Sequence, residues 1–247
     1  MAGAPVDDAR TAFVVLAGGS GSRVGAEVNK VYLPLAGRRV VSWSFAWARQ
    51  VPGIRRFVLV VRAVDADLAH SVVAAEVLGL PVEVVLGGAT RPDSEQAALD
   101  HLAPGVAHGE IDVVALHDGA RPLAGPALVR SVVTTAAAVG GAVPAVPAEA
   151  LLPVDGAGHL RSGARAGGPR LARVQTPQAF RAADLFAAYS AAARDGYRGT
   201  DTASSVEAYA QVDVRVVPGS RQNLKVTYAH DLALAERLLA AHGHRLL

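Results

Sequence analysis

The chain contains no cysteine among its 247 residues. This absence excludes disulfides, thiolate metal sites and a thiol nucleophile, and it fits a reducing compartment. Charge is also scarce, because only 19% of residues are charged and the formal net charge is +2. A nucleic-acid-binding surface needs dense neutralisation of phosphates, so we expect no nucleic-acid partner. A few well-placed cations would still suit a small anionic substrate.

Long hydrophobic runs are missing as well. The longest uncharged stretch, 131–148, is interrupted by glycine and proline and is too short to span a bilayer. The first ten residues, MAGAPVDDAR, have neither the basic start nor the apolar run of a signal peptide. We therefore expect a cytoplasmic protein that has no membrane partner.

Apolar residues make up 51% of the chain, which is enough for one large α/β domain or two small ones. Short apolar runs predict strands over 12–18, 57–63, 81–88, 112–118, 141–148 and 212–219. Helical spacing predicts helices over 65–78, 93–103, 126–139, 181–194, 202–210 and 228–242. Apolar strands separated by helices indicate a mostly parallel sheet with helices on both faces. Residues 149–172, rich in glycine and arginine, are predicted to form a loop or a protruding arm.

Three predicted strands end in unusual sequences: GGSGSR, GGATRPDS and HDGARP. Parallel α/β sheets bind ligands at the carboxyl ends of their strands. In the first sequence, Gly18 and Gly19 let bare backbone approach a phosphate, and Arg23 and Lys30 add positive charge nearby. A glycine turn alone is equally compatible with a tight connection between a strand and a helix. The three ends together predict one shared site.

Two common phosphate-binding loops do not fit. The pattern G-x-x-x-x-G-K-[ST] is absent because the chain has no Gly-Lys pair. The dinucleotide pattern G-x-G-x-x-G would need a third glycine where Val24 stands, and Asp65 lies too far along to bind a ribose.

The other two strand ends carry charged side chains beside glycine. Gly88 is followed by Arg91 and Ser94, and either Ser94 or Asp93 could simply cap the next helix. In HDGARP, Asp118 and Arg121 flank Gly119, although a lone pair of this kind is often only a salt bridge. Three further segments, TPQ (176–178), TD (200–201) and NLKVT (223–227), bring hydroxyls and Lys225 from the last third of the chain.

The ordered set LAGGSGSRVG, NK, GGATRPDS, HDGARP, QTPQAF, TDTAS and NLKVT resembles the 2-C-methyl-D-erythritol 4-phosphate cytidylyltransferases of the non-mevalonate isoprenoid pathway. The resemblance runs from about residue 12 to residue 238 and implies a single Rossmann-like nucleotidyltransferase domain over residues 1–247. It also implies a homodimer formed through the projecting arm 149–172, and a divalent metal, usually Mg²⁺, bound mainly through the phosphates of CTP.

The resemblance implies a role for each matching residue. Residues that act on the reacting phosphates would be Arg23, Lys30, Asp118 and Lys225. Residues that bind the nucleotide would be Ala17, Gly18, Gly19, Gly88, Arg91, Ser94 and Gly119. Residues that bind the polyol phosphate would be Arg121, Thr176, Thr200 and, from the arm, Arg165. No protein metal ligands are implied.

This chain departs from the family pattern at three places. The usual Asp-Thr-x-Lys after the fifth strand is replaced by Ala150, Leu151, Leu152 and Pro153. The usual arm arginine is replaced by Gly168, and a residue that is often acidic is Ala89. The expected reaction transfers CMP from CTP to 2-C-methyl-D-erythritol 4-phosphate and releases pyrophosphate. Two alternatives stay open: a pentitol phosphate such as ribitol 5-phosphate as acceptor, and a non-catalytic paralog that binds nucleotide.

Overall fold

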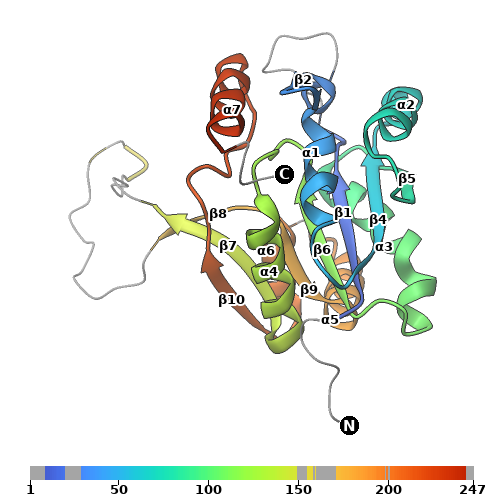
Figure 1. Cartoon of the computed structure of the whole chain (residues 1–247). Coiled ribbons are helices and arrows are strands. Elements are labelled where there is room, and N and C mark those ends of the chain that lie inside the picture. The colour runs from blue at the N-terminus through green and yellow to red at the C-terminus, as the bar shows by residue number, and fades with distance from the viewer. Residues whose placement is uncertain are drawn as a thin grey trace.

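The structure is a computed structural model that describes residues 9–19, 29–148, 155–157, 159, 171–197, 199 and 201–242. An eight-stranded sheet lies between helices that cover both of its faces (Figure 1). The fold is therefore α/β with a mostly parallel central sheet, as the sequence predicts. None of the described helices is both long and apolar enough to span a membrane.

The described elements are as follows. The main sheet contains β1 (Thr11–Leu16), β4 (Ile54–Val61), β5 (Val82–Leu86), β6 (Val113–Asp118), β7 (Gly140–Pro147), β8 (Ala172–Val174), β9 (Gln178–Arg181) and β10 (Asp213–Pro218). The α-helices are α1 (Val40–Ala48), α2 (Ala66–Glu76), α3 (Arg91–Ala107), α4 (Gly125–Val139), α5 (Ala182–Asp195), α6 (Thr202–Tyr209) and α7 (Ala229–His242). Shorter elements are the 3-10 helices η3 (Lys30–Tyr32) and η4 (Ala63–Asp65) and the hairpin strands β2 (Pro34–Leu35) and β3 (Arg38–Arg39).

The strand order places four parallel strands side by side. The order is β10-β7-β9-β6-β1-β4-β5, with β8 beside β7. Strand β1 pairs in parallel with both β4 and β6, so that Leu16 lies opposite Val60 and Asp118. Strand β4 in turn pairs in parallel with β5. The carboxyl ends of β1, β4, β5 and β6 consequently meet at one edge of the sheet.

The alternation of side chains along each strand builds two cores. On β1, Phe13 and Val15 belong to the core that is completed by α1, α2, α4 and α7. Ala12 and Val14 belong to the core on the opposite face, which is completed by α3, α5 and α6. All four side chains are fully buried. A strand that is covered on both faces must be apolar at every position, which explains the continuous apolar runs in the sequence.

The predicted strands and helices are confirmed, with shifted ends, and the sequence missed several elements. Helix α1 escaped prediction because eight of its nine residues, from the sequence VVSWSFAWA, are buried. A helix that is apolar all round shows no polar face to reveal its period. The helix predicted over 181–194 is α5, which starts at Ala182 because Arg181 is the last residue of β9, a strand that was not predicted. Strand β9 is antiparallel to β6 and β7, so the sheet is not purely parallel.

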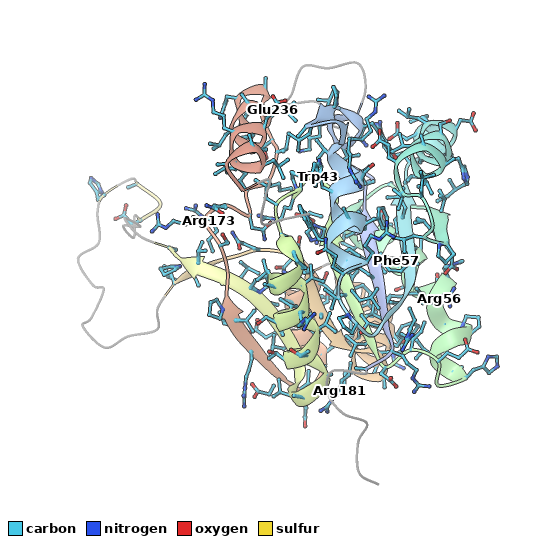
Figure 2. All side chains as sticks on the ribbon, viewed as in Figure 1. Trp43, Arg56, Phe57, Arg173, Arg181 and Glu236 are labelled. Carbon is cyan, nitrogen blue, oxygen red and sulfur yellow. The ribbon has the colours of Figure 1, made fainter. Side chains whose placement is uncertain are left out.

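Strands β7 and β8 form an antiparallel ladder at the base of the expected arm. Its pairs are Ala145 with Val174, Val146 with Arg173, and Pro147 with Ala172. The carboxyl end of β7 projects beyond the helices at the left of the view (Figure 1). Arg173 lies on this extension, away from the cores in which Trp43 and Phe57 pack (Figure 2). The expected arm, 149–172, lies largely outside the described residues.

Candidate active site

A cavity of about 660 Å³ opens at the carboxyl ends of β1, β4, β5 and β6. Its walls include the backbone turns after β1 and β5, the end of β4 and the last residue of β6. The lining residues that carry the argument below are Gly18, Gly19, Asn29, Lys30, Arg62, Gly88, Thr90, Arg91, Ser94, Asp118 and Lys225. This volume suits a ligand of nucleotide size, and the position is the usual ligand site of an open α/β sheet.

Lysine is rare in this chain, and its placement is informative. The chain has two lysines, Lys30 and Lys225. Both line the cavity, although they come from opposite ends of the sequence. A lysine ammonium is a compact point charge that binds phosphates well. Both lysines therefore lie where they could neutralise an anionic ligand.

Asp118 is the centre of the charged network at the cavity floor. Lys225 Nζ lies 2.8 Å from Asp118 Oδ2, and Arg121 Nε lies 3.6 Å from the same oxygen. Arg91 Nη1 donates to Asp118 Oδ1. The carboxylate side chain is only 8% exposed, so these three cations compensate a charge that is largely withdrawn from water.

This surrounding charge fixes the ionisation of the site. Burial alone would raise the pKa of Asp118, but attraction by Arg91 and Lys225 outweighs it and holds that pKa well below its usual range. Burial would likewise lower the pKa of Arg91, but Asp118 and Glu95 outweigh it and raise that pKa. Asp118 is therefore an anion and Arg91 a cation at neutral pH.

Arg91 is held by a second carboxylate, on its own helix. Arg91 Nε donates to Glu95 Oε1 at 2.9 Å. Glu95 is almost fully buried, and it also accepts hydrogen bonds from Thr202 and Tyr189. Arg91 consequently bridges two buried carboxylates at the cavity wall.

Thr176 and His117 form a buried layer beneath Asp118. The backbone N–H of Asp118 donates to Thr176 Oγ1 at 2.9 Å, and this oxygen lies 3.1 Å from His117 Nδ1. His117 Nε2 lies 3.1 Å from the carbonyl oxygen of Arg121. Burial lowers the pKa of His117 to about 4, so the ring is neutral at pH 7. The Thr176 hydroxyl then donates to Nδ1, and Nε2–H donates to the carbonyl, which fixes the turn after β6.

The loop that carries Lys225 is tied to this layer by several hydrogen bonds. Asn223 Nδ2 donates to the carbonyl of Thr176 at 2.9 Å, and the carbonyl of Asn223 accepts from Arg121 Nη1 at 2.8 Å. The backbone N–H of Val226 donates to Ala120 at 2.8 Å. The segments TPQ, HDGARP and NLKVT therefore form one unit, although each taken alone resembles an ordinary turn.

Lys30 is placed by a second network, below the glycine turn. It begins η3, which is preceded by the N-cap residue Asn29. Asn29 Nδ2 donates to the carbonyl of Ala17 at 2.8 Å and to Asp65 Oδ2 at 3.0 Å. Asp65 also accepts two hydrogen bonds from Arg62, at 2.7 and 2.9 Å. Asp65 therefore connects the end of β4 to the residue before Lys30, which is a structural role.

The N-terminal end of α3 forms another part of the cavity wall. Thr90 is the N-cap residue and Asp93 completes the capping box, so the expectation that Asp93 or Ser94 caps the helix is correct only in part. Ser94 Oγ instead donates to the carbonyl of Thr90 at 3.0 Å. A Cβ on Gly88 would lie 2.3 Å from the Cβ of Asp93, so only glycine fits there. A Cβ on Gly19 would meet no atom of the described residues within 4 Å, which leaves room for a ligand beside this part of the chain.

The expected site residues fall into three groups. Those that line the cavity are Gly18, Gly19, Lys30, Gly88, Arg91, Ser94, Asp118 and Lys225. Those that lie behind the lining are Ala17, Gly119, Arg121 and Thr176. Those that lie outside the described residues are Arg23, Thr200 and Arg165. The structure therefore brings together twelve residues from six separate segments.

Three residues of the site were not found from the sequence. Arg62 and Asn29 line the cavity, and Glu95 holds Arg91. Glu95 lies four residues after Arg91, but the helix was predicted only from residue 93, so their ion pair within α3 was not anticipated. Arg62 directly follows an apolar strand, as the residues of the other strand ends do. No local pattern distinguishes Asn29 from a residue in an ordinary turn.

Comparison with known proteins agrees with this geometry. The sequence model of the 2-C-methyl-D-erythritol 4-phosphate cytidylyltransferase family matches residues 11–241. The protein of that name from Cereibacter sphaeroides is 39% identical over 231 residues, which cover 93% of this chain and 97% of the relative. The protein of that name from Solibacter usitatus is 33% identical over 245 residues, which cover 96% and 98%.

Solved structures show the same likeness. The crystal structure of 2-C-methyl-D-erythritol 4-phosphate cytidylyltransferase from Thermus thermophilus has a TM-score of 0.69 and 29% identity, over 92% of this chain and 98% of that chain. The 4-diphosphocytidyl-2C-methyl-D-erythritol synthase of Anaerococcus prevotii shares the fold, with a TM-score of 0.80 and 23% identity over 95% and 100%. The family model and the relatives cover nearly the whole chain, and the chain belongs to the 2-C-methyl-D-erythritol 4-phosphate cytidylyltransferases, a family of nucleotidyltransferase enzymes.

Proposed function

We propose that this chain transfers CMP from CTP to the phosphate of 2-C-methyl-D-erythritol 4-phosphate and releases pyrophosphate. The observation that carries the proposal is the cluster of Arg91, Arg121 and Lys225 around the buried Asp118, at the floor of a cavity of nucleotide size. Three cations held in place by one anion suit a ligand with several phosphates. The names of the relatives supply the identity of the acceptor.

The reaction needs charge and orientation rather than a protein base. An oxygen of the acceptor phosphate attacks the α-phosphorus of CTP, a new P–O bond forms, and the bond to the pyrophosphate oxygen breaks. Because the attacking oxygen is already an anion, no proton has to be removed. His117 could not act as a base on the substrate, since it is fully buried and both ring nitrogens have partners within the fold. Lys30 and Lys225 would stabilise the charge that develops on the phosphates.

We assign the nucleotide to the wall formed by the turns after β1 and β5. The backbone of Ala17, Gly18 and Gly19 would lie along the cytidine and its ribose. Gly88 and Ser94 would contact the cytosine ring, because their backbone and hydroxyl groups lie at the cavity wall. Arg23, Lys30 and Arg91 would bind the triphosphate, with Asp118 and Gly119 near the ribose and the reacting phosphates.

We assign the acceptor to the side of Asp118 that faces the last third of the chain. Arg121, Thr200 and Arg165 would bind the polyol phosphate. Thr176 would support this side of the site from the buried layer beneath Asp118. Its hydroxyl accepts a hydrogen bond from the backbone N–H of Asp118 and lies within hydrogen-bond distance of His117 Nδ1. A contact between Thr176 and the substrate would need this arrangement to change.

The residues present fit a divalent ion that arrives with the nucleotide. Mg²⁺ is usually held by one or two carboxylates together with substrate phosphates. Asp118 is the one carboxylate in the described lining of the cavity, and the described residues hold no cluster of three metal-binding side chains. A bound ion would neutralise phosphate oxygens and would be held mainly by the phosphates of CTP, because both oxygens of Asp118 are already paired with cations of the protein.

We also propose a homodimer that forms through the arm 149–172. Leu171 and Val174, beside β7 at the base of the arm, are 66% and 38% exposed. Val216, on the edge strand β10 that flanks β7 on its other side, is 62% exposed. Exposed apolar side chains around a projecting ladder are typical of a surface that another chain covers.

Release of pyrophosphate tests the proposed function directly. The purified protein is incubated with CTP and Mg²⁺, with 2-C-methyl-D-erythritol 4-phosphate, ribitol 5-phosphate or no acceptor. We expect pyrophosphate release that depends on 2-C-methyl-D-erythritol 4-phosphate, and mass spectrometry should detect the product 4-diphosphocytidyl-2-C-methyl-D-erythritol. Binding of CTP without release from any acceptor would instead identify a non-catalytic paralog.

A further inference from the structure

Glu95 is a buried carboxylate that lies outside the cavity lining. Its side chain is 2% exposed, and it accepts hydrogen bonds from three side chains of three different helices. Arg91 Nε of α3 donates to Oε1 at 2.9 Å and Thr202 Oγ1 of α6 donates to the same oxygen at 2.8 Å. Tyr189 of α5 donates to Oε2 at 2.5 Å. Both oxygens of Glu95 therefore have donors, and only one donor carries a charge.

A buried carboxylate costs free energy unless it is paired and hydrogen-bonded. A leucine at this position would avoid burying a charge, but it would leave the buried hydroxyls of Tyr189 and Thr202 without this acceptor. The one charge that Glu95 compensates is that of Arg91, whose side chain is 28% exposed at the cavity. Glu95 thus connects the core helices α5 and α6 to a charged side chain of the cavity wall.

The two carboxylates leave one part of the Arg91 guanidinium available. Nε is occupied by Glu95 and Nη1 by Asp118. Within the described part of the chain, Nη2 has no hydrogen-bond partner, and Arg91 lines the cavity. A guanidinium is planar, so fixing two of its nitrogens also fixes the direction of the third. Nη2 keeps two N–H donors for a ligand phosphate.

We propose that Glu95 is a positioning residue that orients Arg91 toward a phosphate of the bound nucleotide. Thr202 and Tyr189 hold Glu95 in place, and Glu95 in turn holds Nε of Arg91. Without the carboxylate, Arg91 would keep one contact to Asp118 and could rotate about it. CTP binding would then have to restrict the rotation of the Arg91 side chain, and this loss of conformational freedom would weaken the affinity for CTP. The proposal rests on the proposed function only in taking the ligand to be CTP.

A double-mutant cycle on CTP affinity tests the proposal. Glu95→Gln, Arg91→Ala and the double variant are compared with the unaltered chain by titration calorimetry with CTP and Mg²⁺. Glu95→Gln preserves the shape of the side chain but removes the charge that Arg91 needs. We expect this substitution to weaken CTP binding about tenfold. In the Arg91→Ala background it should cause no further loss, because no guanidinium remains to be oriented.

Two control variants separate positioning from a purely structural role. Gln96→Ala changes the next residue of α3 and should leave CTP affinity unchanged. Tyr189→Phe removes one donor to Glu95 but preserves its charge, so it should weaken binding less than Glu95→Gln does. Thermal unfolding shows which variants are folded at the titration temperature. If Glu95→Gln does not fold, Thr202→Val, which removes one donor to Glu95, takes its place in the double-mutant cycle with Arg91→Ala.

The outcomes for Glu95 and for the proposed function are distinguishable. The positioning role would be overturned if Glu95→Gln weakened CTP binding equally in the unaltered chain and in Arg91→Ala. It would also be overturned if Glu95→Gln lowered the melting temperature but left CTP affinity unchanged. A coupled cycle in a protein that binds CTP but releases no pyrophosphate would support the role of Glu95 and refute the proposed reaction. If the unaltered chain binds no CTP, both proposals are wrong.

Discussion

Lys225 and Asp118 form a direct ion pair, with 2.8 Å between Nζ and Oδ2, although they lie in different thirds of the chain. The pair connects the loop after β10 to the end of β6, where Arg91 and Arg121 meet the same carboxylate. Asp118 therefore organises the cations of the site, and its removal should affect both stability and turnover.

The substitution Asp118→Asn should destabilise the fold in a pH-dependent way. Near neutral pH we expect a loss on the order of 3 kcal/mol in the free energy of unfolding, because three cations lose a buried partner. The folded pKa of Asp118 lies well below the ordinary 3.8. The stabilisation is therefore complete above pH 3.8 and is lost as the pH falls below it toward the folded pKa.

Urea denaturation between about pH 3 and pH 7 measures this difference. The gap between the unaltered chain and Asp118→Asn should be constant near neutrality and narrow below about pH 4. Asp67→Asn, on the exposed face of α2, serves as the control and should change stability by less than about 0.5 kcal/mol. A gap that stays constant down to the lowest pH would contradict the role of Asp118.

The substitution Lys30→Ala should reduce kcat by on the order of 10² or more, because it removes a charge that stabilises the transition state. Lys30 lines the cavity and is only 8% exposed, so its charge lies at the ligand site and not in bulk solvent. Steady-state release of pyrophosphate provides the measurement. Arg130→Ala, which removes an exposed cation of α4, should turn over normally. Near-normal turnover in a folded Lys30→Ala protein would exclude this role.

The two lysines also allow a test that needs no substitution. An amine-reactive reagent can modify only Lys30, Lys225 and the terminal amine, since the chain has no other lysine. Lys225, with 41% of its side chain exposed, should react faster than the buried Lys30. Saturating CTP with Mg²⁺ should protect both from modification, as followed by peptide mass spectrometry. ATP at the same concentration is the control, and equal protection by ATP would contradict a site selective for cytosine.

Much of the fold and part of the site follow from local sequence, and the reason is physical. An apolar strand that ends in glycine or in a charged residue reveals the edge of a parallel sheet, and Gly88 and Asp118 were found in this way. The capping residues and the ends of most helices depend on neighbours a few positions away. These features were therefore predictable to within a few residues.

Other features depend on contacts between distant segments. Glu95 accepts hydrogen bonds from Tyr189 and Thr202, which lie about a hundred positions further along the chain. Thr176 was expected to bind substrate, but its hydroxyl meets His117 and the backbone of Asp118. Neither arrangement has a signal within a local window of sequence. Which polar residues of a site support others can be read only from the packed structure.

The arm should control both assembly and activity. Residues 149–172 include Leu151, Leu152 and Val154, which need cover from another surface. We expect the intact protein to be a dimer at micromolar concentration by light scattering. Deleting residues 155–168 should weaken association and turnover together, since the arm is also expected to supply Arg165. An intact protein that is monomeric at this concentration would contradict the proposed dimer.

The acceptor side departs most from the family pattern, and it therefore yields the sharpest test of substrate identity. Leu151 stands where the family usually has threonine and can donate no hydrogen bond to a polyol. Gly168 stands where the family usually has arginine. Losing a hydrogen bond to a charged phosphate costs about 1.5–3 kcal/mol, which corresponds to roughly ten- to a hundredfold in affinity.

We therefore expect a high KM for 2-C-methyl-D-erythritol 4-phosphate, unless an arginine of the arm replaces the missing contact. Arg165 is the proposed replacement, because it lies three positions before Gly168 in a glycine-rich segment. The test compares kcat/KM for 2-C-methyl-D-erythritol 4-phosphate and ribitol 5-phosphate in the unaltered chain and in Arg165→Ala. Arg165→Ala should lower kcat/KM for the acceptor about tenfold or more, with the KM for CTP nearly unchanged. Arg161→Ala and Arg170→Ala are matched controls from the same segment. If Arg161→Ala or Arg170→Ala reduces kcat/KM and Arg165→Ala does not, the arginine removed in that variant provides the contact. A clear preference of the unaltered chain for ribitol 5-phosphate would assign the chain a different acceptor.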